Sequence, residues 1–386
     1  MSSRVDPNFK YTLKGFGKGD WNECYHCGNC TATCPLSEDG FLFPRKGVRA
    51  IQMGLKDKLA GYLDPWLCYY CGECSKTCPR DANPGELMMT LRRYLTSVYD
   101  WTGFSGRLYK SMKAHIAVVI FLFLSVITVF LILADFSIPL GTTEEGEKIV
   151  QLNAFAPHEF ISTIDHILLG ILSFFLLTNI LNMFIKVVIK DKSIRVPIYM
   201  YFIQMWEGIF HFATQARFSK CEGKRTYWFI HWFCMSSYVI MFAMIIFFLA
   251  WFQTDNVYPI THPQRWLGYY VTIGLIFGSV YFLIGRFRKN REMFKFSHHS
   301  DWIFLILLFL LAFTGILIHI FRVSGLPLAT YIAYMVHLAV EVPMVVTFVA
   351  FSKWSHLAYR PMGIFFANCK KAVLRKQYKM QVSPAF

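Results

Sequence analysis

The feature that most restricts the fold of this 386-residue chain is a cysteine run that occurs twice near its start. Each run has the spacing C-x2-C-x2-C-x3-C and is followed directly by proline. The runs consist of Cys24, Cys27, Cys30 and Cys34, and of Cys68, Cys71, Cys74 and Cys78. With this spacing, three thiolates hold three irons of a 4Fe-4S cube, and the fourth cysteine ligates the cube of the other run. The fold must therefore bring the two runs together.

The exchange of the fourth cysteine predicts the ligands of two clusters. Those of cluster one are Cys24, Cys27, Cys30 and Cys78, and those of cluster two are Cys68, Cys71, Cys74 and Cys34. Structural zinc is the alternative, because the spacing C-x2-C alone also suits zinc. Two complete runs that both end in Cys-Pro favour iron–sulfur clusters.

The composition excludes an ordinary soluble globular protein. Hydrophobic residues make up 55% of the chain, and the mean hydropathy is +0.39. The net charge of +15 is explained by Lys and Arg retained on one side of a membrane, so no nucleic-acid partner is expected. The cysteine runs need thiolates and thus a reducing compartment. Residues 1–20 lack the apolar segment of a cleavable signal, so we expect the runs to stay in the cytoplasm.

Residues 1–106 are predicted to form a mainly α-helical cytoplasmic domain that binds both clusters. Apolar residues recur three or four positions apart in two segments beside the runs. They are Val48, Ile51, Leu55 and Leu59 in the first segment, and Leu87, Leu91 and Leu95 in the second. Pro44 and Pro84 stand where the first turn of each helix would begin.

Apolar stretches between residues 107 and 360 predict a helical membrane domain with six spans. The expected spans are about 114–135, 160–188, 226–252, 265–286, 301–321 and 328–352. Lys and Arg concentrate in residues 186–225 and 286–295 and after residue 353, whereas the other loops hold Lys148, Arg265 and Arg322. This asymmetry predicts a multi-pass protein of the cell inner (cytoplasmic) membrane, with both termini and the cluster domain in the cytoplasm. Residues 361–386 are expected to form a basic cytoplasmic tail.

Residues 198–218 are aromatic but too polar to span a membrane. Gln204, Glu207, His211 and Gln215 fall three or four residues apart and form a polar stripe on one helix. We expect this helix to lie in the plane of the membrane surface. It is either a simple anchor, or Glu207 and His211 line a quinone pocket or its proton path.

Four histidines in or beside the spans predict two sites for haem b. An imidazole inside a span is costly, so it indicates function. His231 and His356 fall near the inside, and His337 and His166 nearer the outside. Two bis-histidine sites stacked across the membrane would let two haems carry electrons between its faces. His319, near the outside end of the fifth span, is the alternative to His166 as the fourth ligand.

The chain resembles the membrane-bound C subunits of the quinone-interacting membrane-bound oxidoreductase complexes of sulfate reducers. Its first part is similar to the small iron–sulfur subunit of heterodisulfide reductase through both cysteine runs and residues 49–54 and 86–93. From about residue 160, it is similar to the cytochrome b subunits of heterodisulfide and nitrate reductases. The residues that carry this second likeness are His231, Trp232, Phe233, Thr314 to Leu317, Arg322, His337, Lys353, His356 and Tyr359 to Pro361.

One position departs from this resemblance. Met241 stands where the nitrate reductase relatives carry a second histidine, about ten residues after the inner one. The fourth haem ligand therefore stays open between His166 and His319. The chain also lacks the paired Cys-Cys-Gly repeats that form a catalytic cluster in some relatives. The resemblance therefore implies a protein that conducts electrons and has no terminal substrate site.

The implied function is that of the membrane electron-transfer subunit of a respiratory menaquinol oxidoreductase. Its cofactors would be two 4Fe-4S clusters and two haems b, with menaquinone as substrate. Its direct partners would be flavin-containing subunits of the same complex, which resemble the flavoprotein of heterodisulfide reductase. The electron acceptor in sulfate reduction would be adenylylsulfate reductase. The membrane part would contact lipid. The alternatives are the membrane arm of a heterodisulfide reductase-type complex and a non-redox transporter or scaffold with a zinc-bound head.

Overall fold

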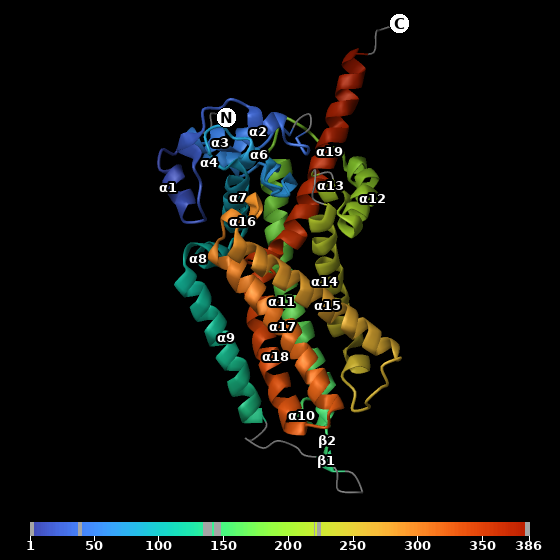
Figure 1. Cartoon of the computed structure of the whole chain (residues 1–386). Coiled ribbons are helices and arrows are strands. Elements are labelled where there is room, and N and C mark those ends of the chain that lie inside the picture. Colours follow the sequence, from blue (N-terminus) through green and yellow to red (C-terminus); the bar gives the residue numbers. More distant parts are fainter. Residues whose placement is uncertain are drawn as a thin grey trace.

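The computed structural model describes residues 4–37, 41–133, 141–142, 148–219, 221 and 225–382. A head of short helices lies at one end of six long helices (Figure 1). This confirms the predicted fold class, in which a helical cluster domain precedes six apolar spans. Two short strands in the described residues, β1 (Gly141–Thr142) and β2 (Lys148–Ile149), pair antiparallel at the end of the spans opposite the head.

The head consists of short helices that connect and follow the cysteine runs. They are α1 (Phe9–Lys14), η1 (Trp21–Glu23), α2 (Asn29–Ala32), α3 (Arg45–Gln52), α4 (Lys56–Leu59), α5 (Asp64–Leu67), α6 (Glu73–Lys76), α7 (Pro84–Tyr99) and α8 (Phe104–Lys110). The second segment predicted from periodicity is α7. The first is divided into α3 and α4, because Gly54 between them has a left-handed φ of 63°, so Leu55 and Leu59 lie beyond the end of α3. Leu87, Leu91 and Leu95 on α7 are at most 1% exposed, so the apolar stripe of this helix forms part of the core.

Helices α2 and α6 begin in the same way within the two cysteine runs. Gly28 before α2 has φ of 90°, and Gly72 before α6 has φ of 89°, a left-handed conformation that favours glycine. A Cβ atom at Gly72 would also lie 2.4 Å from the Cβ of Glu292, on α16 (Glu292–Lys295). The repeated sequence thus produces a repeated local structure, and one copy contacts the membrane domain.

Among the described residues, six helices are long and apolar enough to cross a membrane. They are α9 (Met112–Leu133), α11 (His158–Phe184) with its π-helical continuation η2 (Ile185–Ile189), α14 (Arg225–Phe252), α15 (Pro263–Arg288), α17 (His299–Val323) and α18 (Pro327–Phe348). Each coincides with a predicted span. Residues 134 and 135 of the first predicted span lie outside the described residues.

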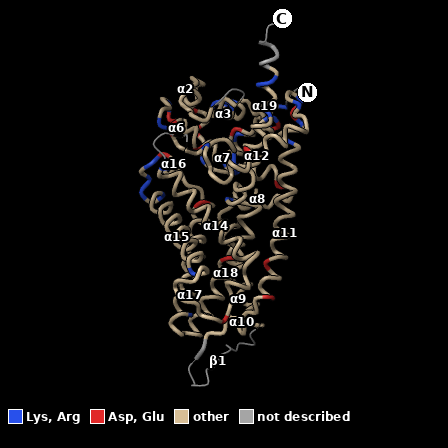
Figure 2. Tube along the Cα trace, turned by 90° about the vertical axis from the view of Figure 1, so that its right-hand side faces the viewer, with Lys and Arg blue, Asp and Glu red and all other residues tan. Residues whose placement is uncertain are grey.

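The spans pack on one another in a defined order. Helix α9 contacts α18, α18 contacts α17, α17 contacts α15, α15 contacts α14, and α14 contacts α11. The short helix α10 (Leu152–Phe155) lies at the end opposite the head, and α13 (Ala216–Ser219) lies at the head side. Figure 2 shows Lys and Arg gathered at the head-side end, with few along the spans. This is the distribution that the loop charges predict.

The C-terminal segment, for which we expected a basic tail from residue 361, forms a helix as far as residue 382. A short turn, η3 (Lys353–Ser355), leads directly into α19 (His356–Val382), so the boundary expected after residue 360 falls inside this helix. Helix α19 packs on α5 and on α12 (Ile198–Thr214) because its apolar residues are buried there, among them Ile364 and Ala367. Residues 383–386 of the expected tail lie outside the described residues.

The head and the spans share one hydrophobic core. It contains Trp66 and Leu67 of α5, Met183 of α11 and Tyr359 of α19. The rings of Trp66 and Tyr359 lie 5.2 Å apart. Apolar packing therefore holds the second cysteine run close to the ends of the spans.

Candidate functional site

Four cysteines from the two runs surround one small cavity in the head. Cys24, Cys27, Cys30 and Cys78 line it. These are the residues predicted to ligate cluster one, and they include the fourth cysteine of the second run. The rest of the wall includes residues at the start of α3 and α7.

The predicted ligands of cluster two also lie near one another. Cys34 interacts electrostatically with Cys68 and Cys71, and Cys74 interacts with all three. Burial, together with Cys68, raises the pKa of the Cys34 thiol to about 12. Because cluster ligands are thiolates, iron binding at this position would release a proton.

Within the described ranges, no group of three or more His, Cys, Asp or Glu side chains is placed to hold a single metal ion. A 4Fe-4S cluster needs ligands that stand farther apart than the four ligands of one zinc ion.

The sequence of this region matches a known family. Residues 20–82 match the model of the 4Fe-4S dicluster domain. The head contains a 4Fe-4S dicluster domain. Both cysteine runs lie inside the matched region, so the dicluster domain is the part of the chain that binds iron–sulfur clusters.

A stretch of this chain is also similar to a protein of Archaeoglobus profundus that is named for its likeness to the C subunit of heterodisulfide reductase. The two sequences are 38% identical over 88 residues, which are 22% of this chain and 47% of the relative. The chain thus spans about half the length of the relative that it matches. The similarity supports a head of this heterodisulfide reductase type in a redox electron-transfer protein.

Two arginines hold the backbone at the second cysteine run. The carbonyl oxygen of Cys68 accepts hydrogen bonds from Arg92 of α7 and from Arg360 of α19, the latter at 3.2 Å from Nη2. The Arg360 guanidinium also lies over the ring of Tyr69, 4.4 Å from its centroid. Burial and the nearby Arg360 lower the pKa of Arg92 to about 9. Cluster two would therefore lie beside cations from both the head and α19.

Cys221 lies next to the predicted ligands of cluster two, although it has no partner at ligand spacing in the sequence. It is 1% exposed. It interacts with Cys71 through a side-chain hydrogen bond, and electrostatically with Cys68 and Cys34. No sequence signal indicates this position, because it depends on the packing of α13 against the head. Phe218 of α13 stacks on Tyr69 with ring centroids 4.8 Å apart.

A cavity lies between the head and the spans. It contains about 200 Å³ of free space. Its walls come from α5, α7, α14, α15, α17 and the start of α19. His231 of α14 and His356 of α19 line it together with Trp66 and Tyr69 of the head. The structure thus places both predicted inner haem ligands on the wall of one cavity.

Each of these two histidines is oriented through its Nδ1 atom. The Nδ1 of His231 lies 2.9 Å from Oε1 of Gln215, and the Nδ1 of His356 is hydrogen-bonded to the carbonyl of Lys353. Within the described part of the chain, no hydrogen bond involves either Nε2. A histidine that binds a metal typically has this arrangement, because the second nitrogen fixes the tautomer and the ring orientation.

The charges around the cavity suit a bound ligand with carboxylate groups. One acid, Asp301, lines it, together with the cations Arg92, Arg93, Arg286, Lys353 and Arg360. Burial lowers the pKa of His356 well below its usual value, and Arg360 lowers it further. The His356 imidazole is therefore neutral, which is the form that ligates iron.

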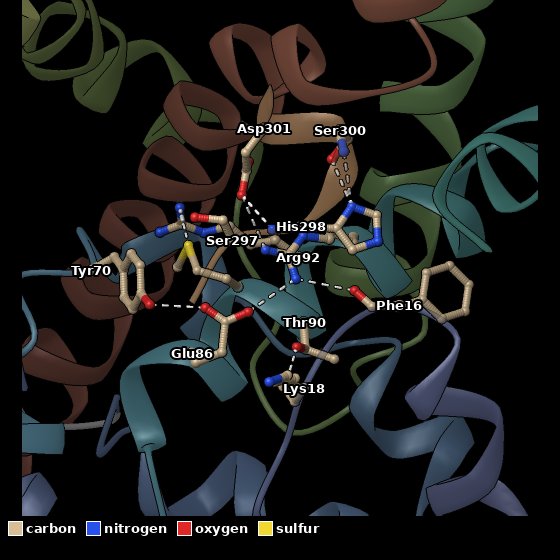
Figure 3. Close-up of polar contacts among 12 residues, drawn as sticks. Phe16, Lys18, Tyr70, Glu86, Thr90, Arg92, Ser297, His298, Ser300 and Asp301 are labelled. Carbon is tan, nitrogen blue, oxygen red and sulfur yellow. Dashed lines mark hydrogen bonds and ion pairs between the residues drawn. The ribbon is translucent and has the colours of Figure 1, made fainter. Parts of the chain in front are cut away.

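Asp301 at the start of α17 joins the head to the spans by ion pairs. Its carboxylate pairs with Arg93 of α7 at 3.6 Å, with Arg286 of α15 at 3.5 Å, and with Lys353. Arg93 also pairs with Glu86 of α7 at 3.2 Å. Figure 3 shows Asp301 and Glu86 on opposite sides of these contacts. Sequence reasoning missed Asp301 because its partners come from distant segments.

The predicted outer histidines differ in their surroundings. The Nδ1 of His337 lies 2.9 Å from Oγ1 of Thr314, so this ring is fixed as the inner ones are. His166 is exposed on α11, and its Nδ1 lies 2.6 Å from the carbonyl oxygen of Ser162 on the same helix. In the part of the chain that the structure describes, no hydrogen bond or ring contact joins His337 to His166.

The alternative fourth ligand, His319, has both ring nitrogens occupied. Its Nδ1 lies 2.7 Å from Nη1 of Arg265, and its Nε2 lies 2.8 Å from the hydroxyl of Tyr269. In this arrangement His319 has no free nitrogen for iron. The fourth haem ligand stays a prediction.

Helix α12 exposes a broad apolar surface. Ile198, Phe202 and Trp206 are 77%, 69% and 75% exposed. A helix with such a surface is unsuited to water but suited to the surface layer of a membrane. The position expected for residues 198–218 in the membrane surface stays a prediction. The helix itself ends at Thr214, because Gln215 has a left-handed φ of 50°, and α13 follows.

The two residues predicted to form a quinone or proton site lie in different surroundings. Glu207 is exposed on α12. The Nε2 of His211 lies 2.7 Å from the hydroxyl of Tyr69, and His211 lines a small cavity together with His231 and His356. His211 therefore belongs to the surroundings of the inner histidines.

Proposed function

We propose that this chain is the membrane electron-transfer subunit of a respiratory menaquinol oxidoreductase. The dicluster domain, the similarity to the Archaeoglobus profundus protein and the six apolar spans support a membrane redox subunit. In this proposal, electrons pass between menaquinone, two haems b, two 4Fe-4S clusters and flavin-containing partner subunits. The chain itself holds no terminal substrate site.

The observation that carries the proposal is the cavity shared by His231 and His356. Both rings are oriented through Nδ1, and both belong to a wall that also contains Tyr69 of the second cysteine run. Haem b bound there would supply a one-electron carrier between the spans and cluster two. The two fixed imidazoles beside Tyr69 therefore support a haem that receives or delivers electrons at the head.

The residues around this cavity have distinct roles in the proposal. Gln215 and the Lys353 carbonyl hold the two imidazoles in place. Trp66 and Tyr69 are 1% and 5% exposed and exclude water between the cavity and cluster two. Low exposure to water and nearby charges set the reduction potentials of such sites. We propose Cys24, Cys27, Cys30 and Cys78 as the ligands of cluster one, and Cys68, Cys71, Cys74 and Cys34 as those of cluster two.

The second haem would use His337, fixed by Thr314, on the side away from the head. We propose His166 as its partner, because its Nε2 has no hydrogen bond to any described residue, whereas His319 uses both nitrogens. His166 would have to turn from its exposed position to reach the bundle interior. Two haems would then connect the two membrane faces.

The proposed cellular context follows from the loop charges and the family resemblance. The head would lie in the cytoplasm and face the flavin-containing subunits, with adenylylsulfate reductase as electron acceptor in sulfate reduction. His211, and Glu207 one turn before it, are the proposed quinone or proton site. Electrons that cross from the outside inward would move against a potential that costs about 2.3 kcal/mol per charge for each 100 mV.

The test is an optical redox titration of the purified full-length protein with single histidine variants. We expect His231→Gln and His356→Gln to abolish the same haem b signal, because both nitrogens would bind one iron. His337→Gln should abolish the other signal. His158→Gln is the control, because His158 begins α11 and is no proposed ligand. Two unchanged signals in His231→Gln and His356→Gln would refute the inner site.

The same samples decide two further points. His166→Gln should remove the outer haem signal, and His319→Gln should leave it unchanged. The reverse result would assign the fourth ligand to His319.

The iron, acid-labile sulfide and zinc contents of the same samples are then measured. A colourless protein that contains zinc would contradict the electron-transfer function and favour a transporter or scaffold.

The membrane arm of a heterodisulfide reductase-type complex is the second candidate. The relative from Archaeoglobus profundus, named for a heterodisulfide reductase component, favours it. The two candidates differ in the lipid-soluble carrier. Menaquinone extracted with the native complex would support the first candidate, and a methanophenazine would support the second.

A further inference from the structure

A second cavity lies where the N-terminal segment, α8 and the segment between α15 and α17 meet. It contains about 500 Å³ of free space. One acid, Glu86, lines it, together with the basic residues Lys14, Lys18, Arg93, Lys110, Lys289 and Lys295. None of the proposed cluster or haem ligands belongs to its wall. It is therefore separate from the proposed electron-transfer site, and we call it the lysine cavity.

Most of the positive charge of the lysine cavity is not neutralised by its own walls. Arg93 pairs with Glu86, and Lys295 pairs with Glu292. Ion pairs within the described ranges are absent for Lys14, Lys18, Lys110 and Lys289. A concave surface with such an excess of one charge concentrates ligands of the opposite charge.

Aromatic rings and backbone hold two of these lysines in place. The Nζ of Lys110 lies 5.1 Å from the ring centroid of Phe16, and the Nζ of Lys18 lies 5.8 Å from that of Phe296. A Cβ atom at Gly15 would lie 3.2 Å from Cγ of Lys110, so the stem of this lysine packs against the end of α1. The ammonium groups keep donors free for a ligand.

The lysine cavity lies at the head-side ends of three spans. Lys110 is the last residue of α8, just before α9, and Lys289 directly follows α15. Trp302 in the first turn of α17 lines the cavity, and its ring lies 4.8 Å from that of Phe287 near the end of α15. Tryptophan at the ends of spans is typical of the level of lipid headgroups.

We propose that the lysine cavity binds the phosphate-bearing headgroup of an anionic phospholipid. Lysine binds phosphate as a point charge, and basic pockets at the ends of membrane helices recognise acidic headgroups. Trp302 and Phe296 add apolar surface beside the glycerol and the first methylene groups. A lipid fits this position better than an acidic polypeptide, because lipid surrounds the ends of the spans. The proposal does not depend on the electron-transfer function.

The test measures lipid retention by the full-length protein with its clusters. Protein in an uncharged detergent is incubated with phosphatidylglycerol or phosphatidylcholine, and bound lipid is counted by native mass spectrometry. The test variant combines Lys14→Gln, Lys18→Gln, Lys110→Gln and Lys289→Gln. The control variant removes the same charge outside the cavity through Lys10→Gln, Lys56→Gln, Lys58→Gln and Lys192→Gln. We expect the test variant to bind phosphatidylglycerol at least tenfold more weakly, and the control to bind it as the wild type does.

Each other outcome overturns the proposal. Equal binding by the wild type and the test variant would show that the lysine cavity holds no lipid. An equal loss in both variants would show that overall charge, and not the cavity, attracts lipid. Binding of inorganic phosphate that is lost in the test variant, without binding of phosphatidylglycerol, would assign the cavity to free phosphate. If the test variant loses its cluster absorbance, the double variant Lys110→Gln/Lys289→Gln replaces it.

Discussion

The guanidinium of Arg360 donates a hydrogen bond to the carbonyl oxygen of Cys68, 292 positions earlier in the chain, at 3.2 Å. Arg360 lies one helical turn after His356 on α19. A residue of the predicted cluster two and a predicted haem ligand are therefore connected by one short helical segment. This link lets a single side chain affect both the potential of the cluster and its position relative to the spans.

Arg360→Leu should lower the midpoint potential of one 4Fe-4S cluster. Reduction adds negative charge to the cluster, and the removed guanidinium no longer stabilises it. We expect a decrease of about 60 mV, which is tenfold in the equilibrium constant of a one-electron reduction. The measurement is a redox titration followed by electron paramagnetic resonance. Arg49→Leu, at an exposed position of α3, should leave both potentials unchanged, and an equal shift in the two variants would contradict the role of Arg360.

Cys221→Ala should lower the potential of the same cluster, because a hydrogen bond to a ligand sulfur favours the reduced state. Cys221 interacts with Cys71 in this way. Cys221→Ser keeps a donor and should shift the potential less. The control is Cys369→Ala, which removes another buried thiol that lies on α19. A potential unchanged in Cys221→Ala would show that Cys221 only fills space.

The sequence was sufficient to predict the helices and spans because their signals are local. The cysteine spacing sets the turns at Gly28 and Gly72, and long apolar stretches specify the spans whatever their neighbours are. The environments of His166 and His319 could not be predicted in the same way. Helix α11 is apolar on nearly all sides, so its sequence does not determine which face turns inward.

Contacts between distant segments could not be predicted from the sequence either. Cys221 contacts Cys71 only because α13 packs against the head. Asp301 forms ion pairs with cations of α7, of α15 and of the turn before α19. Residues 361–382 of the expected basic tail form part of α19. Buried apolar residues such as Ile364 and Ala367 precede the lysines and arginines of the tail, which begin at Lys370.

Asp301→Asn should loosen the attachment of the head to the spans. The variant leaves Arg93, Arg286 and Lys353 without their shared carboxylate in a buried place, and breaking such a network costs about 3–5 kcal/mol. We expect a lower temperature for the loss of cluster absorbance on heating in detergent. Asp255→Asn is the control, because Asp255 is exposed in the segment that connects α14 to α15. Equal melting of Asp301→Asn and the wild type would show that the ion pairs contribute little to stability.

Gly363→Val should separate α19 from α5. A Cβ atom at Gly363 would lie 2.7 Å from the Cβ of Trp66, closer than packed atoms can approach, so one of the two helices must move. Overpacking of this kind costs about 1–3 kcal/mol. Because Trp66 lies close to the second cysteine run and His356 begins α19, we expect lower thermal stability and slower electron exchange between the proposed inner haem and the proposed cluster two. Gly170→Val is the matched control, because nothing lies within 4 Å of a Cβ atom at Gly170 on α11. Rapid-mixing spectroscopy measures the rate of this electron exchange. Equal rates in Gly363→Val and Gly170→Val would show that the contact between α5 and α19 does not set the distance between the proposed haem and the proposed cluster.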